Sequence, residues 1–231
     1  MATILYGKPV ADRLCAELKT RVQALGVTPA LATVRVGAEE ADESYARAIE
    51  KRCDLIGVRL QKHALAKDAG QAALEEKLRE LNSAHDVHGI LLYRPLPEGY
   101  DERAAAACID AQKDVDCMTE ASLAGVCLGT GKGFAPCTPE ACLRILEHYS
   151  VELEGKHAVV LGRSAVVGRP LATLLLRKNA TVTVCHSRTQ HLAELCRTAD
   201  ILVAAVGKAR LVTAEFVKPG ADGARRGHPL E

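Results

Sequence analysis

The sequence predicts an α/β protein in which parallel strands are covered by helices. Strand-like and helix-like segments alternate from residue 9 to residue 109, and the alternation resumes at residue 139. The connection between these two halves, residues 110–138, is rich in glycine and has no sustained period. A long irregular connection of this kind often joins two domains, so we place a domain boundary near residue 135.

The elements follow from hydrophobic periodicity and from glycine or proline at their ends. In the first half, apolar residues at helical spacing and short apolar runs predict three strands between four helices. The helices cover residues 9–25, 42–56, 68–81 and 100–109, and the strands cover residues 31–36, 58–63 and 88–93. The second half repeats the alternation. Its helices cover residues 139–148, 171–176 and 190–197, and its strands cover residues 156–161, 180–185 and 201–206.

A glycine-bounded turn stands at the centre of the second half. Gly162 ends an apolar strand, and Gly168 precedes an amphipathic helix. This order is typical of the phosphate-binding turn of a nucleotide-binding βαβ unit, whose next strand ends near the ribose. Here that strand ends at His186 and Ser187. The spacing differs from G-x-G-x-x-G, and similar turns occur in α/β proteins that bind no nucleotide, so both interpretations stay open.

Composition and charge argue against several classes of protein. The chain has 231 residues, 48% hydrophobic residues and a net charge of +1, which gives no reason to expect a nucleic-acid partner. The N-terminus lacks the apolar core of a signal peptide, and no apolar run reaches membrane-spanning length. We therefore expect a cytoplasmic protein without membrane contact. Nine cysteines without a C-x-x-C pair argue against a disulfide framework and against a structural metal site.

Four blocks of sequence, taken together, resemble the bifunctional methylenetetrahydrofolate dehydrogenase/methenyltetrahydrofolate cyclohydrolase family. They are Lys113-Asp114-Val115-Asp116, Pro136-Cys137-Thr138-Pro139, Gly162 to Pro170, and Cys185-His186-Ser187-Arg188-Thr189. The resemblance covers residues 3–220. It implies a one-carbon-metabolism enzyme of two α/β domains around a cleft, acting as a homodimer. The first domain, residues 1–135, would bind folate and carry the catalytic residues. The second domain, residues 136–220, would be a Rossmann-like domain that binds NADP.

The resemblance also implies the site residues. Folate would contact Tyr45, Tyr93, Pro95 and Asp116, of which Tyr45 and Asp116 would be catalytic. NADP would contact Thr138, Gly162, Arg163, Ser164, Val167, Gly168, His186, Ser187 and Gly207. A guanidinium and a hydroxyl near the ribose suit a 2′-phosphate, which is the role implied for Arg163 and Ser187. From the local sequence alone, Asp116 could instead cap loop N–H groups, and Tyr45 could be a packing residue.

The chain also departs from the family. The family has a lysine one helical turn after the tyrosine, and this chain has Ile49 there. The family's next pocket strand carries Val-Gln-Leu-Pro-Leu-Pro, and this chain has Tyr93 at the glutamine position. Cys117 replaces a glycine, and residues 221–231 show no strand or helix pattern and are expected to form an irregular tail. Isoleucine cannot move protons, so we expect impaired cyclohydrolase activity. The alternative is a catalytically inactive relative that binds nucleotide or folate, or serves as an interaction partner.

Overall fold

The computed structural model describes residues 3–37, 40–208, 210–218 and 222–225. The chain divides into two compact units. The N-terminal unit comprises Lys8–Gly125 and Gly131–Phe134, and the C-terminal unit comprises Met1–Gly7, Val126–Thr130 and Ala135–Glu231. Each unit has its own parallel sheet, and this confirms the predicted α/β class.

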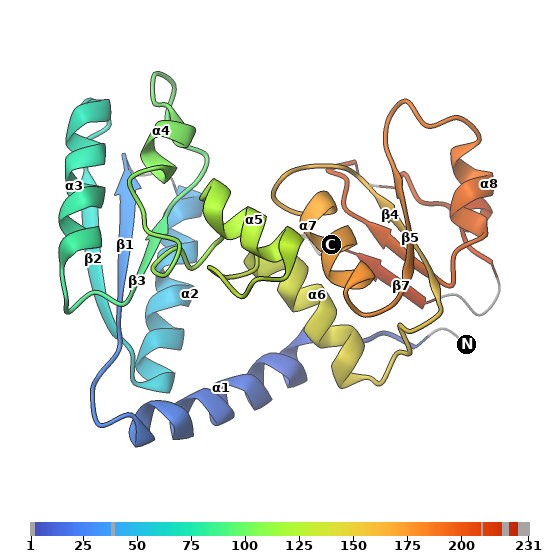
Figure 1. Ribbon diagram of the computed structural model, residues 1–231, viewed down its shortest axis with the longest axis horizontal. Coiled ribbons are helices and arrows are strands. Elements are labelled where there is room, and N and C mark those ends of the chain that lie inside the picture. The colour runs from blue at the N-terminus through green and yellow to red at the C-terminus, as the bar shows by residue number, and fades with distance from the viewer. Residues whose placement is uncertain (1–2, 38–39, 209, 219–221, 226–231) are drawn as a thin grey trace. The chain divides into compact units, whose positions relative to one another are not determined.

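The N-terminal unit alternates helices and strands in the predicted order (Figure 1). Its elements are α1 (Gly7–Ala24), β1 (Ala30–Val36), α2 (Glu40–Ile56), β2 (Arg59–Leu65), α3 (Gln71–Ser83), β3 (Gly89–Leu92), α4 (Glu102–Ala106) and α5 (Glu120–Leu128). The helix predicted over residues 100–109 is shorter than expected. Asp101 caps α4 by accepting hydrogen bonds from the N–H groups of Arg103 and Ala104, which fixes where that helix begins.

The sheet of the N-terminal unit has the order β2-β1-β3, with every pair parallel. Its core combines Val34 of β1 and Ile90 of β3 with Leu74 and Leu78 of α3, all of which are essentially inaccessible to solvent. Because β1 is followed by β2 on one side and β3 joins on the other, the chain reverses direction across the sheet at the ends of β1 and β3. In open α/β sheets, ligands bind outside the carboxyl ends of the strands at such a point.

The C-terminal unit contains a second doubly wound sheet. Its elements are α6 (Cys137–His148), β4 (His157–Leu161), α7 (Gly168–Leu176), β5 (Thr181–Cys185), α8 (Leu192–Arg197), β6 (Ile201–Ala204), a 3₁₀ turn (Ala214–Phe216) and β7 (Asp222–Arg225). The strands are parallel in the order β5-β4-β6-β7, and the switch point lies at the ends of β4 and β6.

Both faces of β4 are covered, as expected for a central parallel strand. On one face, Val159 and Leu161 pack in a core with Cys185 of β5 and Cys196 of α8. Helix α7 contacts β4 and β5 through a second buried set that includes Leu171. Burial raises the pKa of the Cys196 thiol to about 11, so this cysteine is a packing residue at neutral pH.

The connection predicted to be irregular contains helix α5. Its buried positions are Ser122, Gly125 and Val126, which lie at helical spacing but are mostly small and weakly hydrophobic. They are small because the chain passes close by: a Cβ on Gly125 would overlap the carbonyl oxygen of Lys132. Sequence periodicity relies on large apolar residues and therefore missed this helix.

Two other local expectations were wrong. The helix predicted over residues 139–148 begins two residues earlier, at Cys137, with Pro136 as its N-cap, so Thr138 lies inside its first turn. Residues 222–225, expected to belong to an irregular tail, form β7 beside β6. Strand pairing uses main-chain groups, so a short edge strand needs no alternating apolar pattern. The rest of the predicted tail lies outside the described residues.

Candidate functional site

In the N-terminal unit, two of the predicted folate residues lie together. Tyr93 follows β3, and its N–H donates a hydrogen bond to the carbonyl of Val34 at 2.9 Å. Its ring meets the ring of Tyr45 edge to face, with the centroids 5.4 Å apart and the planes at 70°. Tyr93 is buried at 8% exposure, whereas Tyr45 is 51% exposed. Tyr45 therefore exposes part of its side chain to solvent, packs against the buried ring of Tyr93 and is not a core residue.

The helix that carries Tyr45 presents Ile49 one turn later. Residues four apart on a helix lie on the same face, so Ile49 takes the position next to Tyr45. Lys51 is exposed and lies two residues further along, roughly 200° around the helix axis. The only ammonium group among these three residues thus points away from the tyrosine pair.

Asp116 forms an ion pair with Arg94. The Nη2 atom of Arg94 lies 2.8 Å from Oδ2 of Asp116, and the two side chains are 21% and 25% exposed. Arg94 is joined to the exposed Pro95 by a cis peptide bond. Arg94 was not among the predicted site residues. The sequence marks it only by its place directly after Tyr93, at the carboxyl end of a buried strand.

The loop that carries Asp116 is held by its neighbours. The carboxylate of Asp114 is buried and accepts hydrogen bonds from the N–H groups of Met118 and Thr119 at 2.9 and 2.8 Å. Asp114 thus caps two backbone N–H groups of this loop. Cys117 adopts a φ of 55°, the left-handed conformation that glycine favours, so the loop keeps a glycine-like backbone despite the substitution.

In the C-terminal unit, the glycine turn connects β4 to α7 as predicted. Gly162 has a φ of 118°, and its N–H donates to the carbonyl of Cys185 at 2.8 Å. A Cβ on Gly162 would overlap the carbonyl of Ala205, and one on Gly168 would overlap the carbonyl of Gly162. A side chain at position 162 would therefore collide with the segment after β6, and one at position 168 would collide with the residue that follows β4. Both positions need glycine for this reason.

The remaining residues of this turn have separate roles. The hydroxyl of Ser164 accepts hydrogen bonds from the N–H groups of Val167 and Gly168 at 3.1 and 3.3 Å, so it orders the N-terminus of α7. The side chain of Val167 is buried, which leaves its backbone as the part that a ligand could meet. Arg163 is exposed and therefore accessible to a ligand at the carboxyl end of β4.

The neighbouring strands bring further predicted residues to the same edge of the sheet. After β5, Nδ1 of His186 accepts a hydrogen bond from the N–H of Arg188, and the N–H of His186 donates to Oγ1 of Thr189. This turn leaves Ser187 exposed. After β6, Gly207 is exposed and its Cα has open space where a Cβ would stand. The structure thus places these residues at the carboxyl ends of β5 and β6, on either side of the end of β4, whereas Thr138 lies in the first turn of α6.

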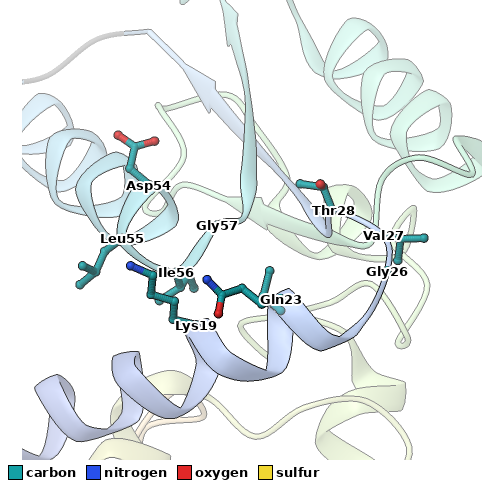
Figure 2. Close-up of a pocket in the computed structure, with 10 residues that line it drawn as sticks. Lys19, Gln23, Gly26, Val27, Thr28, Asp54, Leu55, Ile56 and Gly57 are labelled. Carbon is teal, nitrogen blue, oxygen red and sulfur yellow. The ribbon is translucent and has the colours of Figure 1, made fainter.

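A surface pocket lies elsewhere in the N-terminal unit and contains none of the predicted site residues. It has a volume of about 350 Å³ and lies between the C-terminal parts of α1 and α2 (Figure 2). Its lining residues are Lys19, Val22, Gln23, Gly26, Val27, Thr28, Asp54, Leu55, Ile56 and Gly57. Within the described ranges, His, Cys, Asp and Glu side chains form no group of three or more that could hold a metal ion. Across that same part of the chain, no helix is long and apolar enough to cross a membrane.

The turn at the switch point defines the class of the protein. Its two glycines let a strand, a loop and a helix N-terminus meet, and Arg163 and Ser187 are exposed just after two neighbouring strands. These are features of a dinucleotide-binding Rossmann-like domain. The protein is thus an α/β protein with a dinucleotide-binding domain. Residues 5–116 match the family described as "Tetrahydrofolate dehydrogenase/cyclohydrolase, catalytic domain", and residues 136–222 match its "NAD(P)-binding domain". The chain belongs to the tetrahydrofolate dehydrogenase/cyclohydrolase family.

Similar proteins support this membership. The "Bifunctional protein FolD" of Carboxydothermus hydrogenoformans is 49% identical over 223 residues, which cover 95% of this chain and 78% of that protein. A crystal structure of the bifunctional FolD enzyme from Campylobacter jejuni is 35% identical with a TM-score of 0.92, and the match covers 96% and 79% of the two chains. The Trypanosoma brucei enzyme, solved with NADP cofactor and inhibitor, is 34% identical with a TM-score of 0.89 and coverages of 96% and 77%. These findings confirm the resemblance found in the sequence and support NADP as the cofactor.

Proposed function

We propose that this protein is an NADP-dependent 5,10-methylenetetrahydrofolate dehydrogenase whose cyclohydrolase activity is weak. Family membership supports the substrate class and the cofactor. The observation that separates the two activities is the face of α2, which carries Tyr45 and, one turn later, Ile49. The first can position a planar ligand, whereas the second cannot accept or donate a proton.

The C-terminal unit fits the cofactor. Gly162 and Gly168 let the backbone approach a pyrophosphate closely, and the positive end of the α7 dipole favours the negative charge of that group. Arg163 and Ser187 would hold the 2′-phosphate, because a guanidinium and a hydroxyl both donate to phosphate oxygens. When bound, NADP supplies the hydride acceptor.

The N-terminal unit binds and orients the folate in this proposal. The carboxylate of Asp116 accepts hydrogen bonds from the amino-pyrimidine edge of the pterin, and the exposed ring of Tyr45 lies along the planar ligand. Oxidation of a methylene group between two nitrogens gives a cation that those nitrogens stabilise. The protein therefore contributes mainly positioning, which needs no proton-transfer residue.

Hydrolysis of the methenyl product has different requirements. Water must be activated and protons must be moved, and a positioned lysine can do this at the place where Ile49 stands. The aliphatic side chain of Ile49 can pack against a ligand but cannot carry a proton. Dehydrogenase turnover is thus compatible with this pocket, whereas efficient cyclohydrolase turnover is not.

The test compares both half-reactions in the same preparation. At saturating NADP, we expect reduction of the cofactor with methylenetetrahydrofolate and accumulation of the methenyl product. Hydrolysis of added methenyltetrahydrofolate should stay near the uncatalysed rate. Hydrolysis well above that rate, abolished by Tyr45→Phe and retained in the matched control Tyr6→Phe, would contradict the proposal. Binding of NADP without any reduction would instead select the inactive relative.

A homodimer in the cytoplasm is also part of this proposal. In its support, β5 stands at the edge of its sheet, and Val184 on that strand is 39% exposed. Exposed sheet edges are commonly covered by a partner. Analytical ultracentrifugation should give twice the mass of the chain, and Val184→Lys should lower it to that of a monomer. A monomeric wild-type protein would contradict this part of the proposal.

A further inference from the structure

Beside the proposed folate anchor stands a cation that the family resemblance does not supply. Arg94 lies where the related motif Val-Gln-Leu-Pro-Leu-Pro has leucine, and its Nη2 atom is 2.8 Å from Oδ2 of Asp116. About four-fifths of the Arg94 side chain is withdrawn from solvent. Leucine offers no hydrogen bond, so this substitution adds a donor group directly beside the carboxylate.

The backbone keeps this pair in place. The N–H of Ile90 in β3 donates to the carbonyl of Lys113 at 2.7 Å, so the strand before Arg94 and the loop before Asp116 are joined. The ammonium of Lys113 in turn donates to the carbonyls of Asn82 and Ala84 at 2.8 and 2.7 Å. Both ends of the Arg94–Asp116 contact are thus anchored to the core of the N-terminal unit, so the pair is a fixed feature of the pocket.

The chemistry of a pterin matches the pair. The pyrimidine edge of a folate presents two donors, the 2-amino group and N3–H, followed by one acceptor, the 4-oxo group. A carboxylate only accepts and a guanidinium only donates, so Asp116 suits the two donors and Arg94 suits the acceptor. A guanidinium has five N–H donors, and the contact with Asp116 uses one of them.

We propose that Arg94 is a specificity-determining residue that recognises the 4-oxo group of the pterin while Asp116 binds the adjacent donors. This rests on the proposed function, since it assigns a contact within the same folate site. A 4-amino pteridine has a donor where the 4-oxo group has an acceptor. It would leave the guanidinium facing another donor, which a buried hydrogen-bonding site discriminates against strongly.

Folic acid and aminopterin test this. Aminopterin has a 4-amino group in place of the 4-oxo group and no hydrogen on N3, so it changes the group that faces Arg94 and also removes one of the two donors that face Asp116. We would measure binding of each to the NADP-loaded full-length protein by calorimetry at neutral pH. The wild type should prefer folic acid by about tenfold or more, the value of a hydrogen bond to a charged group. Arg94→Leu should weaken folic acid binding by about tenfold and lower the preference by about the same factor. The part of the preference that comes from N3–H at Asp116 should remain.

Two further variants make the result specific. Arg94→Lys keeps the positive charge but lacks the planar guanidinium and is shorter, so it should retain only part of the preference for folic acid. This variant also serves as the test if Arg94→Leu does not fold. Arg103→Leu is the matched control, because Arg103 forms an exposed ion pair with Glu120 in the same unit and should leave the preference unchanged.

The outcomes separate this inference from the function on which it rests. Equal binding of the two compounds to the wild type, or a preference that Arg94→Leu leaves unchanged, would overturn the role of Arg94 while dehydrogenase activity could persist. Failure of both compounds to bind, together with no oxidation of methylenetetrahydrofolate, would overturn the role of Arg94 and the proposed function together.

Discussion

The carbonyl oxygen of Gly162 occupies the space that a side chain at position 168 would need. The first residue after β4 and the first residue of α7 therefore touch through their backbones. This contact closes the turn and sets the N–H groups at the start of α7 against the carboxyl end of the sheet. The positive end of the α7 dipole therefore lies at this edge, where it favours a phosphate group.

Gly168→Ala should damage both cofactor binding and stability. The added methyl group must displace either the turn or α7, at a cost of about 1–3 kcal/mol. We expect a lower melting temperature and a Kd for NADP raised by about tenfold or more, measured by thermal unfolding and calorimetry. Gly7→Ala is the control, because a Cβ there would meet only Cδ1 of Ile145 at an ordinary 3.4 Å. Unchanged NADP binding in Gly168→Ala would show that the turn does not contact the cofactor.

Ile49→Lys should increase cyclohydrolase activity. The new ammonium would lie one helical turn from Tyr45 and could transfer protons during hydrolysis of the methenyl group. General acid–base catalysis of this kind typically raises the rate by about a hundredfold or more. We expect methenyltetrahydrofolate hydrolysis to rise above the wild-type rate with dehydrogenase activity within a few-fold. Lys51→Ala should affect neither reaction, since Lys51 points elsewhere. Hydrolysis that does not respond to the new lysine would mean that Ile49 is not the limiting replacement.

Arg163→Ala should weaken NADP far more than NAD. Loss of a charge-assisted hydrogen bond to the 2′-phosphate should raise the Kd for NADP by about tenfold or more. The Kd for NAD should change little, because NAD lacks that phosphate. Parallel titrations of the two nucleotides measure the ratio. The control is Arg177→Ala, because Arg177 follows α7 at its other end and lies beside Gly129. An equal effect of Arg163→Ala on both nucleotides would refute the 2′-phosphate assignment.

Asp200→Asn should lower stability in a pH-dependent way. The hydrogen bond from Lys218, with help from the N–H of His157, holds the pKa of the Asp200 carboxyl below its ordinary value of 3.8. A depressed pKa stabilises the folded state above the unfolded value, and this stabilisation is lost as the pH falls through the lower folded value. The melting temperature of the variant should thus fall below that of the wild type at neutral pH. The difference should shrink as the pH drops below 3.8.

The exposed Glu154 provides the control for this measurement. Glu154→Gln should leave the melting temperature unchanged at each pH. A stability difference for Asp200→Asn that stays constant down to the acid limit would show that the carboxylate charge is not what stabilises the unit.

The sequence predicted the nucleotide side better than the folate side. Gly162 and Ser187 follow neighbouring strands and Gly168 begins the helix between those strands, so a strand–turn–helix pattern is enough to bring them together. The pairing of Arg94 with Asp116 joins two loops distant in sequence, and no local pattern encodes it. Helix α5 was missed for a related reason, since its buried face is made of small residues that only a close neighbour explains.

By itself the sequence determined the α/β class, the order of most elements, the glycine turn and the family, because these depend on local periodicity and on contiguous motifs. Only the tertiary structure decided that Tyr93 is buried against Tyr45 and that Asp114 caps its loop through the N–H groups of Met118 and Thr119. It also decided that a guanidinium stands beside the proposed folate anchor. The physical reason is that such contacts arise where the sheet brings distant loops to one edge. Their energies depend on burial and distance, which a linear pattern does not contain.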